Sequence, residues 1–96
     1  MLKLVEIVGE SSYDESKESI IESFLLREIF INPDYIITLR ENVSLRNKSI
    51  KSPIVKGLNN NVFFTELKYS EGKINGPKTI NVVGRPLDII QKYSER

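Results

Sequence analysis

The stretch Phe-Leu-Leu-Arg-Glu-Ile-Phe-Ile-Asn-Pro-Asp-Tyr-Ile-Ile-Thr-Leu-Arg, residues 24–40, carries the clearest structural signal in this sequence. Residues with high strand propensity stand on both sides of an Asn-Pro-Asp turn at 32–34. The proline presets a backbone dihedral that a turn needs, and the Asn and Asp side chains can hydrogen-bond to nearby backbone amides. We therefore predict two strands, over residues 24–31 and 35–40, that pair as an antiparallel hairpin.

Three further segments have the composition of strands. Residues 2–8 place apolar side chains on both faces, which is typical of a strand central to a small barrel. Residues 62–69 and 79–83 are rich in β-branched and aromatic side chains and are bounded by Asn, Gly or Pro. Because residues 62–69 contain few of the prolines and charges that block strand edges, we expect this strand to offer a free edge for self-association.

The chain is expected to end in a short helix. Pro86 stands where a first helical turn tolerates proline, and Leu87, Ile90 and Tyr93 share one helical face. Five strands and this helix bury their apolar faces best in a single domain, residues 1–96, of mainly β, α+β class. We predict a small antiparallel five-stranded sheet, curled into a partly open barrel, with the helix covering one end.

Two longer segments give weaker signals. Residues 10–23 contain a capping box, from Ser12 to Glu15, and apolar residues at helical spacing, which favour a helix. Because this segment runs directly into the next strand, we expect a loop with at most a short helix, and for residues 13–23 the choice between helix, strand and loop stays open. Residues 42–61 are polar and basic and predict a long loop, which in so small a domain is usually functional or disordered.

Composition excludes several kinds of chemistry. The sequence has no Cys and no His, which removes disulfides, thiolate catalysis, the common structural zinc sites and the usual general base near neutral pH. The acidic residues between positions 14 and 22 are organised by no motif and are expected to form a solvated face. Residues 84–86, Gly-Arg-Pro, do not make a phosphate loop, because proline lacks an amide that such a loop needs. We predict a protein that is not an enzyme, with no catalytic residue, no metal and no cofactor.

The sequence also indicates a compartment. No apolar run approaches the ~20 residues that a membrane-spanning helix requires. The N-terminal segment 1–8 contains a charge and no small-residue cleavage site, so it indicates a strand rather than a signal peptide. The absence of cysteine fits a reducing compartment. We expect a cytoplasmic protein with no membrane partner.

Charge is unevenly distributed along a chain whose net charge is +1. Residues 1–41 carry four basic and nine acidic side chains, whereas residues 42–96 carry ten basic and four acidic ones. Two oppositely charged patches on one fold can steer a partner or stack copies head to tail. Because sheet folds mix their two halves in space, we expect this asymmetry to disappear in the folded chain.

A basic and aromatic region is the candidate binding site. Its residues are Arg46, Lys48, Lys51, Lys56, Asn60 and Phe63. Small barrels that bind single-stranded nucleic acid combine positive charge with aromatic rings in this way. The alternative is that the cations keep a loop solvated while the phenylalanines belong to the core, and the low net charge favours this alternative.

The order of several motifs resembles the small flagellar FlbD/SwrD family. The shared features are Gly9, the Ile-Asn-Pro-Asp segment at 31–34 followed by two isoleucines, and Val82-Val83 before a short helix. That family runs strand, glycine turn, Asn-Pro-Asp hairpin, further strands and a helix. The resemblance implies an architecture of this kind.

The sequence is also similar to small uncharacterised proteins of tailed phages that infect cyanobacteria. The similar segments are Leu-Arg-Glu-Ile-Phe-Ile-Asn-Pro at 26–33, the pair Arg40-Glu41, the pair Phe64-Thr65, and Val-Val-Gly at 82–84. This resemblance implies a virus-encoded accessory protein acting in the host cytoplasm, and it brings no assigned activity.

We therefore expect a non-enzymatic accessory or regulatory protein, encoded by a phage, that acts by binding a protein partner or by self-assembly, with a homo-oligomer as its expected state. The alternative is a nucleic-acid-binding small β-barrel that uses the basic region 46–64.

Overall fold

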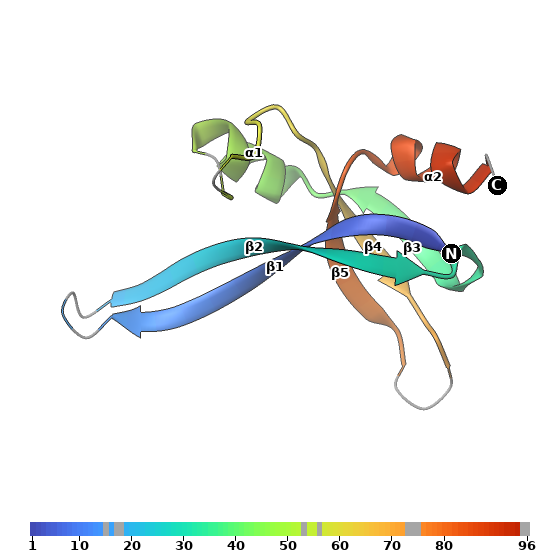
Figure 1. Ribbon diagram of the computed structural model, residues 1–96, viewed down its shortest axis with the longest axis horizontal. Helices are drawn as coiled ribbons and strands as arrows, with labels where there is room; N and C mark the ends of the chain where they lie inside the picture. The colour runs from blue at the N-terminus through green and yellow to red at the C-terminus, as the bar shows by residue number, and fades with distance from the viewer. Residues whose placement is uncertain (15, 17–18, 53, 56, 73–75, 95–96) are drawn as a thin grey trace.

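The described part of the chain forms five strands and two helices (Figure 1). The computed structural model describes residues 1–14, 16, 19–52, 54–55, 57–72 and 76–94. In chain order the elements are β1 (Leu2–Asp14), β2 (Ser19–Ile31), β3 (Ile36–Glu41), α1 (Val43–Lys51), β4 (Phe64–Tyr69), β5 (Lys78–Val83) and α2 (Pro86–Ser94). A short 3-10 helix, Pro33–Tyr35, links β2 to β3.

The strands make one antiparallel sheet in the order β2-β1-β5-β4-β3. This confirms the predicted α+β class, with a five-stranded antiparallel sheet and a C-terminal helix. The sheet is open, because β2 and β3 are its two edges and pair with β1 and β4 alone. The strand at residues 62–69, expected to offer an edge, is instead interior, because β4 pairs with β3 on one side and β5 on the other.

The pairing between β1 and β5 is very short. The β1–β2 hairpin is paired along its whole length, from Leu2↔Ile31 to Asp14↔Ser19. By contrast, β1 meets β5 at two positions, Glu6↔Val82 and Ile7↔Asn81. The hairpin therefore crosses the β3–β4–β5 meander instead of extending it as a flat sheet (Figure 1).

The hairpin predicted across the Asn-Pro-Asp turn is wrong. The turn itself forms, with the Asn32 side-chain oxygen accepting a hydrogen bond from the Asp34 amide at 3.0 Å. It does not pair its two flanking strands, because it carries the chain from one edge of the sheet to the other. A 3-10 helix is longer than the two-residue turns that close hairpins. The inner edge of β2 is already paired with β1, and β3 pairs with β4.

The loop expected over residues 10–23 is also corrected. Residues 10–14 and 19–22 are strand and form the distal half of the hairpin. The local capping-box signal, whose Glu15 lies outside the described residues, is overridden by cross-strand hydrogen bonds that continue past Gly9. Gly9 does not end its strand; it lies opposite Phe24, whose ring is 3.3 Å from where a Cβ would stand.

The predicted long loop over residues 42–61 begins with helix α1. The Asn42 side-chain oxygen caps the helix by accepting a hydrogen bond from the Leu45 amide at 3.0 Å. The Asn42 side-chain nitrogen donates to the Asn81 side-chain oxygen at 2.8 Å, which ties the helix start to β5. A helix this short, with buried residues confined to Leu45 and Ser49, leaves little hydrophobic periodicity for sequence reasoning to detect.

Two clusters of buried apolar side chains form the core. The first contains Leu2, Leu4, Ile31, Leu67, Tyr69, Val82 and Ile89, and the second contains Ile7, Leu45 and Phe64. The two clusters lie on opposite faces of the sheet, because side chains alternate between faces along a strand. In β4, Leu67 of the first cluster is three residues from Phe64 of the second. In β5, Val82 belongs to the first cluster and its neighbour Val83 packs against the second. Helix α2 supplies Ile89 to the first cluster, and α1 supplies Leu45 to the second.

The distal half of the hairpin projects from the rest of the molecule as an arm, defined here by residues 10–14 and 19–22 (Figure 1). The radius of gyration is 15.0 Å and the longest extent is 49 Å. A compact chain of this length would have a radius of gyration of about 12–13 Å. The excess follows from a two-stranded arm that continues beyond the core.

We expect Leu67→Ala to lower the free energy of unfolding by about 2–5 kcal/mol, because it deletes part of a fully buried side chain and leaves a cavity. The matched change Leu87→Ala, on a side chain that is 56% exposed, should cost no more than about 0.5 kcal/mol. Urea denaturation followed by circular dichroism at one fixed protein concentration measures the free energy of unfolding of each variant. Equal losses for the two variants would contradict this placement of the core.

Candidate functional site

Helix α1 brings together part of the predicted binding region. Arg46, Lys48 and Lys51 all lie on this helix. Asn60 is exposed in the turn that precedes β4 and is not part of this helix. Lys56 lies outside the described residues. The predicted loop is therefore a helical basic surface over its first half.

Arg46 stacks on Phe63. Its guanidinium carbon lies 3.6 Å from the centre of the Phe63 ring, a distance at which a cation is attracted to the ring face. The Nη1 atom of Arg46 is buried and has no hydrogen-bond partner among the described residues. The Ser49 hydroxyl, one helical turn further on, is buried without a partner as well. The ring thus holds a guanidinium whose hydrogen-bonding capacity is not used within the described part of the fold.

A second guanidinium lies near the same ring but is already paired. The Arg85 guanidinium carbon is 5.8 Å from the Phe63 ring centre. Arg85 donates to both carboxylate oxygens of Asp88, at 3.0 and 3.2 Å. This side-chain hydrogen bond lowers the pKa of Asp88 below its ordinary value. Of the two guanidiniums at this ring, Arg46 therefore keeps the uncompensated charge.

The two adjacent phenylalanines have different environments. Phe64 is fully buried in the second core cluster, beside Leu45 of α1. Phe63 is half-buried and carries Arg46 on its ring face. Phe63 stands just before β4, whereas Phe64 is the first residue of that strand. Phe63 therefore belongs to the basic surface, and Phe64 belongs to the core.

The outward face of α1 combines apolar and basic groups. Val43 and Ile50 are 54% and 48% exposed, and their spacing of seven residues puts them on one side of the helix. At helical spacing Arg46 lies on one flank of this apolar strip, and Lys48 and Lys51 lie on the other. No ion pair joins any of these three cations to an acidic side chain in the described ranges.

The free edge of β2 is a second candidate surface. Among the described residues this strand of thirteen residues pairs with β1 alone, so one side of its backbone lacks a neighbouring strand there. Leu25, Leu26 and Phe30 on it are 37%, 39% and 55% exposed. Sequence reasoning identified the strand but missed this surface. The sequence did contain a sign of exposed apolar side chains on this strand. Three consecutive apolar residues at 24–26 cannot all point to one face of a strand.

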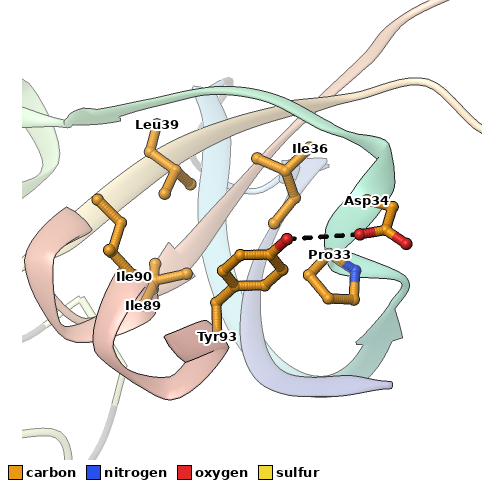
Figure 2. Close-up of a pocket in the computed structure, with 7 residues that line it drawn as sticks. All are labelled: Pro33, Asp34, Ile36, Leu39, Ile89, Ile90 and Tyr93. Carbon is orange, nitrogen blue, oxygen red and sulfur yellow. Dashed lines mark hydrogen bonds between the residues drawn. The ribbon is translucent and has the colours of Figure 1, made fainter. Parts of the chain in front are cut away.

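A groove between α2 and β3 is a third candidate surface (Figure 2). It has a volume of about 380 Å³ and is lined by Pro33, Asp34, Ile36, Leu39, Ile89, Ile90 and Tyr93. The Tyr93 hydroxyl donates to an Asp34 carboxylate oxygen at 3.4 Å across the groove. The helical face shared by Leu87, Ile90 and Tyr93 is largely outward, because Ile89 is the α2 side chain that enters the core.

The described residues contain no group of three Asp or Glu side chains arranged to hold a metal ion. Within the same residues no helix is both long enough and apolar enough to cross a membrane. No protein-family model matches the chain, and neither a curated protein nor a solved structure is similar to it.

We expect Phe64→Ala and Phe63→Ala to differ in their effect on stability. Phe64→Ala should lower the free energy of unfolding by about 3–5 kcal/mol, because its ring has no exposure. Phe63→Ala should cost about 1–2 kcal/mol, from partial burial and the loss of the Arg46 stacking contact. Thermal and urea denaturation of the two variants measures the difference, and a reversed order would contradict the assignment of Phe63 to the surface.

Proposed function

We propose that this chain is a non-enzymatic accessory protein, encoded by a phage as the sequence resemblance implies, that acts by binding a protein through its β1–β2 hairpin. The observation that carries the proposal is the free edge of β2, which runs for thirteen residues and exposes Leu25, Leu26 and Phe30. Exposed apolar edges are templates for an added strand. Main-chain hydrogen bonds would supply affinity, and alternate side chains would supply specificity.

The opposite edge of the sheet is less suited to strand addition. β3 is six residues long, and its pairing register with β4 shifts between Ile36 and Thr38. Short edge strands with irregular pairing resist addition of a further strand. Helix α2 also packs beside β3, where Ile36 and Leu39 line the groove with Ile90. The β2 edge is longer, and its pairing with β1 has no register shift.

A specific observation favours the alternative function, nucleic-acid binding. Arg46 stacked on Phe63, with Lys48 and Lys51 on the same helix, is the combination of cation and ring that single-strand binders use. The net charge of +1 weighs against it, because such proteins are usually strongly basic. Protein binding is therefore the stronger proposal.

We expect the wild-type chain to have a mass above 11.0 kDa by light scattering at micromolar concentration, or to capture a partner protein from host lysate after nuclease treatment. Leu26→Lys should reduce either association at least about tenfold, because a charge at an edge position opposes strand addition. Leu87→Lys, at another exposed leucine, is the matched control and should leave association unchanged. An 11.0 kDa mass together with identical capture by the wild type and Leu26→Lys would count against the proposal.

We expect no sub-micromolar binding to single- or double-stranded DNA or RNA at physiological salt. If such binding occurs, it should fall steeply with salt, because phosphate contacts release counterions. Changing Arg46, Lys48, Lys51 and Lys56 together to Ala should then abolish it. Fluorescence anisotropy with labelled oligonucleotides measures the affinity of the wild type and of the quadruple variant. Tight, salt-sensitive binding by the wild type that the quadruple variant loses would establish the alternative function.

A further inference from the structure

We infer that the gap between β1 and the end of β5 binds an extended acidic segment of a partner protein, which adds to β1 as a short strand. This site lies on the other side of β1 from β2, so it is separate from the β2 edge and goes beyond the proposed function. Three features of the molecule support it: a stretch of β1 backbone with no partner on that side, a groove beside this stretch, and two lysines that line the groove.

The start of β1 lacks a neighbouring strand on the side that faces β5. The two strands pair at only two positions, and β5 ends at Val83. Gly84 then leaves the ladder with a φ of 117°, and its amide donates to the Phe63 carbonyl oxygen at 2.8 Å. Residues 2–4 therefore pair with β2 and with no other described strand. Because the backbone groups of successive residues point to opposite sides of a strand, part of this stretch directs its amide and carbonyl groups into the gap.

A groove occupies this gap. It has a volume of about 500 Å³ and is lined by residues 1–5, Val83 and Lys92. Its lining thus comes from β1, from the end of β5 and from α2. Ligand sites commonly have volumes of about 300–1,000 Å³. An added segment of three residues would be about 10 Å long, which matches the unpaired stretch of β1. Main-chain groups of such a segment would satisfy those of β1, as in other cases of strand addition.

The side chains that line the groove carry positive charge only. Lys3 and Lys92 are among them, and no acidic residue is. Lys92 has no ion pair within the described part of the chain, whereas Lys3 lies 3.3 Å from Glu28. Both side chains of that pair are about 60% exposed, at 59% and 60%, and exposed pairs contribute little. Lys3 is therefore able to meet a further carboxylate, and charge complementarity favours an acidic occupant over a basic or neutral one.

The two ends of the groove differ in character. Figure 1 shows the C-terminal end of α2, which carries Lys92, beside the N-terminal end of β1, and the two elements line the groove together. Both lysines thus lie toward the start of β1. At the other end, next to the crossing, the groove is lined by Val5 and Val83, which are half-buried. An occupant with aliphatic residues at one end and carboxylates at the other would match both ends.

The sheet also indicates the direction of the added segment. All the described strand pairs are antiparallel. A segment that continues the place of β5 beside β1 would therefore run antiparallel to β1. Its first residues would meet the valines near the crossing, and its last residues would meet the lysines. The expected ligand is an extended segment in which aliphatic residues are followed by acidic ones.

Two labelled peptides test the charge of the occupant. The acidic probe is acetyl-Val-Val-Glu-Glu, and the matched control is acetyl-Val-Val-Gln-Gln, both with an amidated C-terminus. The acidic peptide should bind at least about tenfold more tightly, because the control cannot pair its side chains with the lysines. Its binding should weaken as salt is raised. Fluorescence anisotropy measures both affinities, and equal affinities would overturn an acidic occupant.

Substitution of the lysines tests the location of the peptide. Lys3→Gln/Lys92→Gln should weaken binding of the acidic peptide at least about tenfold. Lys68→Gln/Lys78→Gln changes the net charge equally at two exposed lysines outside the groove, and it should leave the affinity unchanged. Circular dichroism establishes that both variants are folded. Equal losses in the two variants would show that net charge alone attracts the peptide, which would overturn the groove as the site.

Methylation of the peptide backbone tests strand addition. In an added antiparallel strand, successive amides point alternately toward β1 and away from it. Methylation of one peptide amide should therefore abolish binding, and methylation of the next amide should leave binding largely intact. In amide spectra of the ¹⁵N-labelled protein, the acidic peptide should shift residues 2–5 and Val83. Equal effects of the two methylations, or shifts confined to the free edge of β2, would contradict addition to β1.

Failure of this inference is distinguishable from failure of the proposed function. Peptide binding that Leu26→Lys loses but Lys3→Gln/Lys92→Gln retains would place the peptide on the β2 edge, which would overturn the groove and support the proposed function. No binding of the acidic peptide at millimolar concentration would overturn the groove and leave the β2 edge untouched. Displacement of the peptide by a single-stranded oligonucleotide that itself requires Lys3 and Lys92 would make nucleic acid the occupant and overturn the inference.

Discussion

Glu6 and Ile7 of β1 pair with Val82 and Asn81 of β5, and through this short ladder the β1–β2 hairpin joins the rest of the sheet. A hairpin held at one point along its length crosses the meander and cannot continue it as a flat layer. Glu6 at this crossing is nearly buried, and Arg27 of β2 lies 3.4 Å from its carboxylate. The proximal end of the hairpin supplies Leu2, Leu4 and Ile31 to the first core cluster, and the region just past the crossing supplies Ile7 to the second.

The crossing also determines which surfaces stay open. Because β5 pairs with only two residues of β1, the far half of the hairpin has no other described strand beside it and projects as the arm. Each core cluster is covered by one helix, with Ile89 of α2 on the first and Leu45 of α1 on the second. Because α1 covers the second cluster with one side, its opposite side faces outward and carries the cations and the apolar strip of Val43 and Ile50. The crossing of the hairpin over the meander thus accounts for both the projecting arm and the outward face of α1.

Part of this arrangement could be predicted from sequence. Strand-forming segments separated by Asn, Gly and Pro identified the body of each strand, and Pro86 with its following residues identified the C-terminal helix. The class and the number of strands followed from these local patterns. The candidate residues Arg46 and Phe63 came from composition alone, and the fold places them in direct contact. Local sequence does not encode that contact, because the two residues are seventeen positions apart and the intervening segment leaves α1 before returning to β4.

Local signals determined which segments contain a strand and which residues favour a turn, since propensity and hydrophobic alternation act over a few neighbouring positions. Tertiary pairing decided which strands are neighbours. The Asn-Pro-Asp turn folded as its residues require, yet it spans the two sheet edges, because β1 competes for β2 along thirteen residues. Residues 10–14 and 19–22 became strand rather than loop for the same reason, and α1 was stabilised by the contact of Leu45 with Ile7 and Phe64 despite its weak periodicity. Partner choice between strands depends on contacts between residues far apart in the chain, and for this reason the arm and the basic helix face emerged only from the folded arrangement.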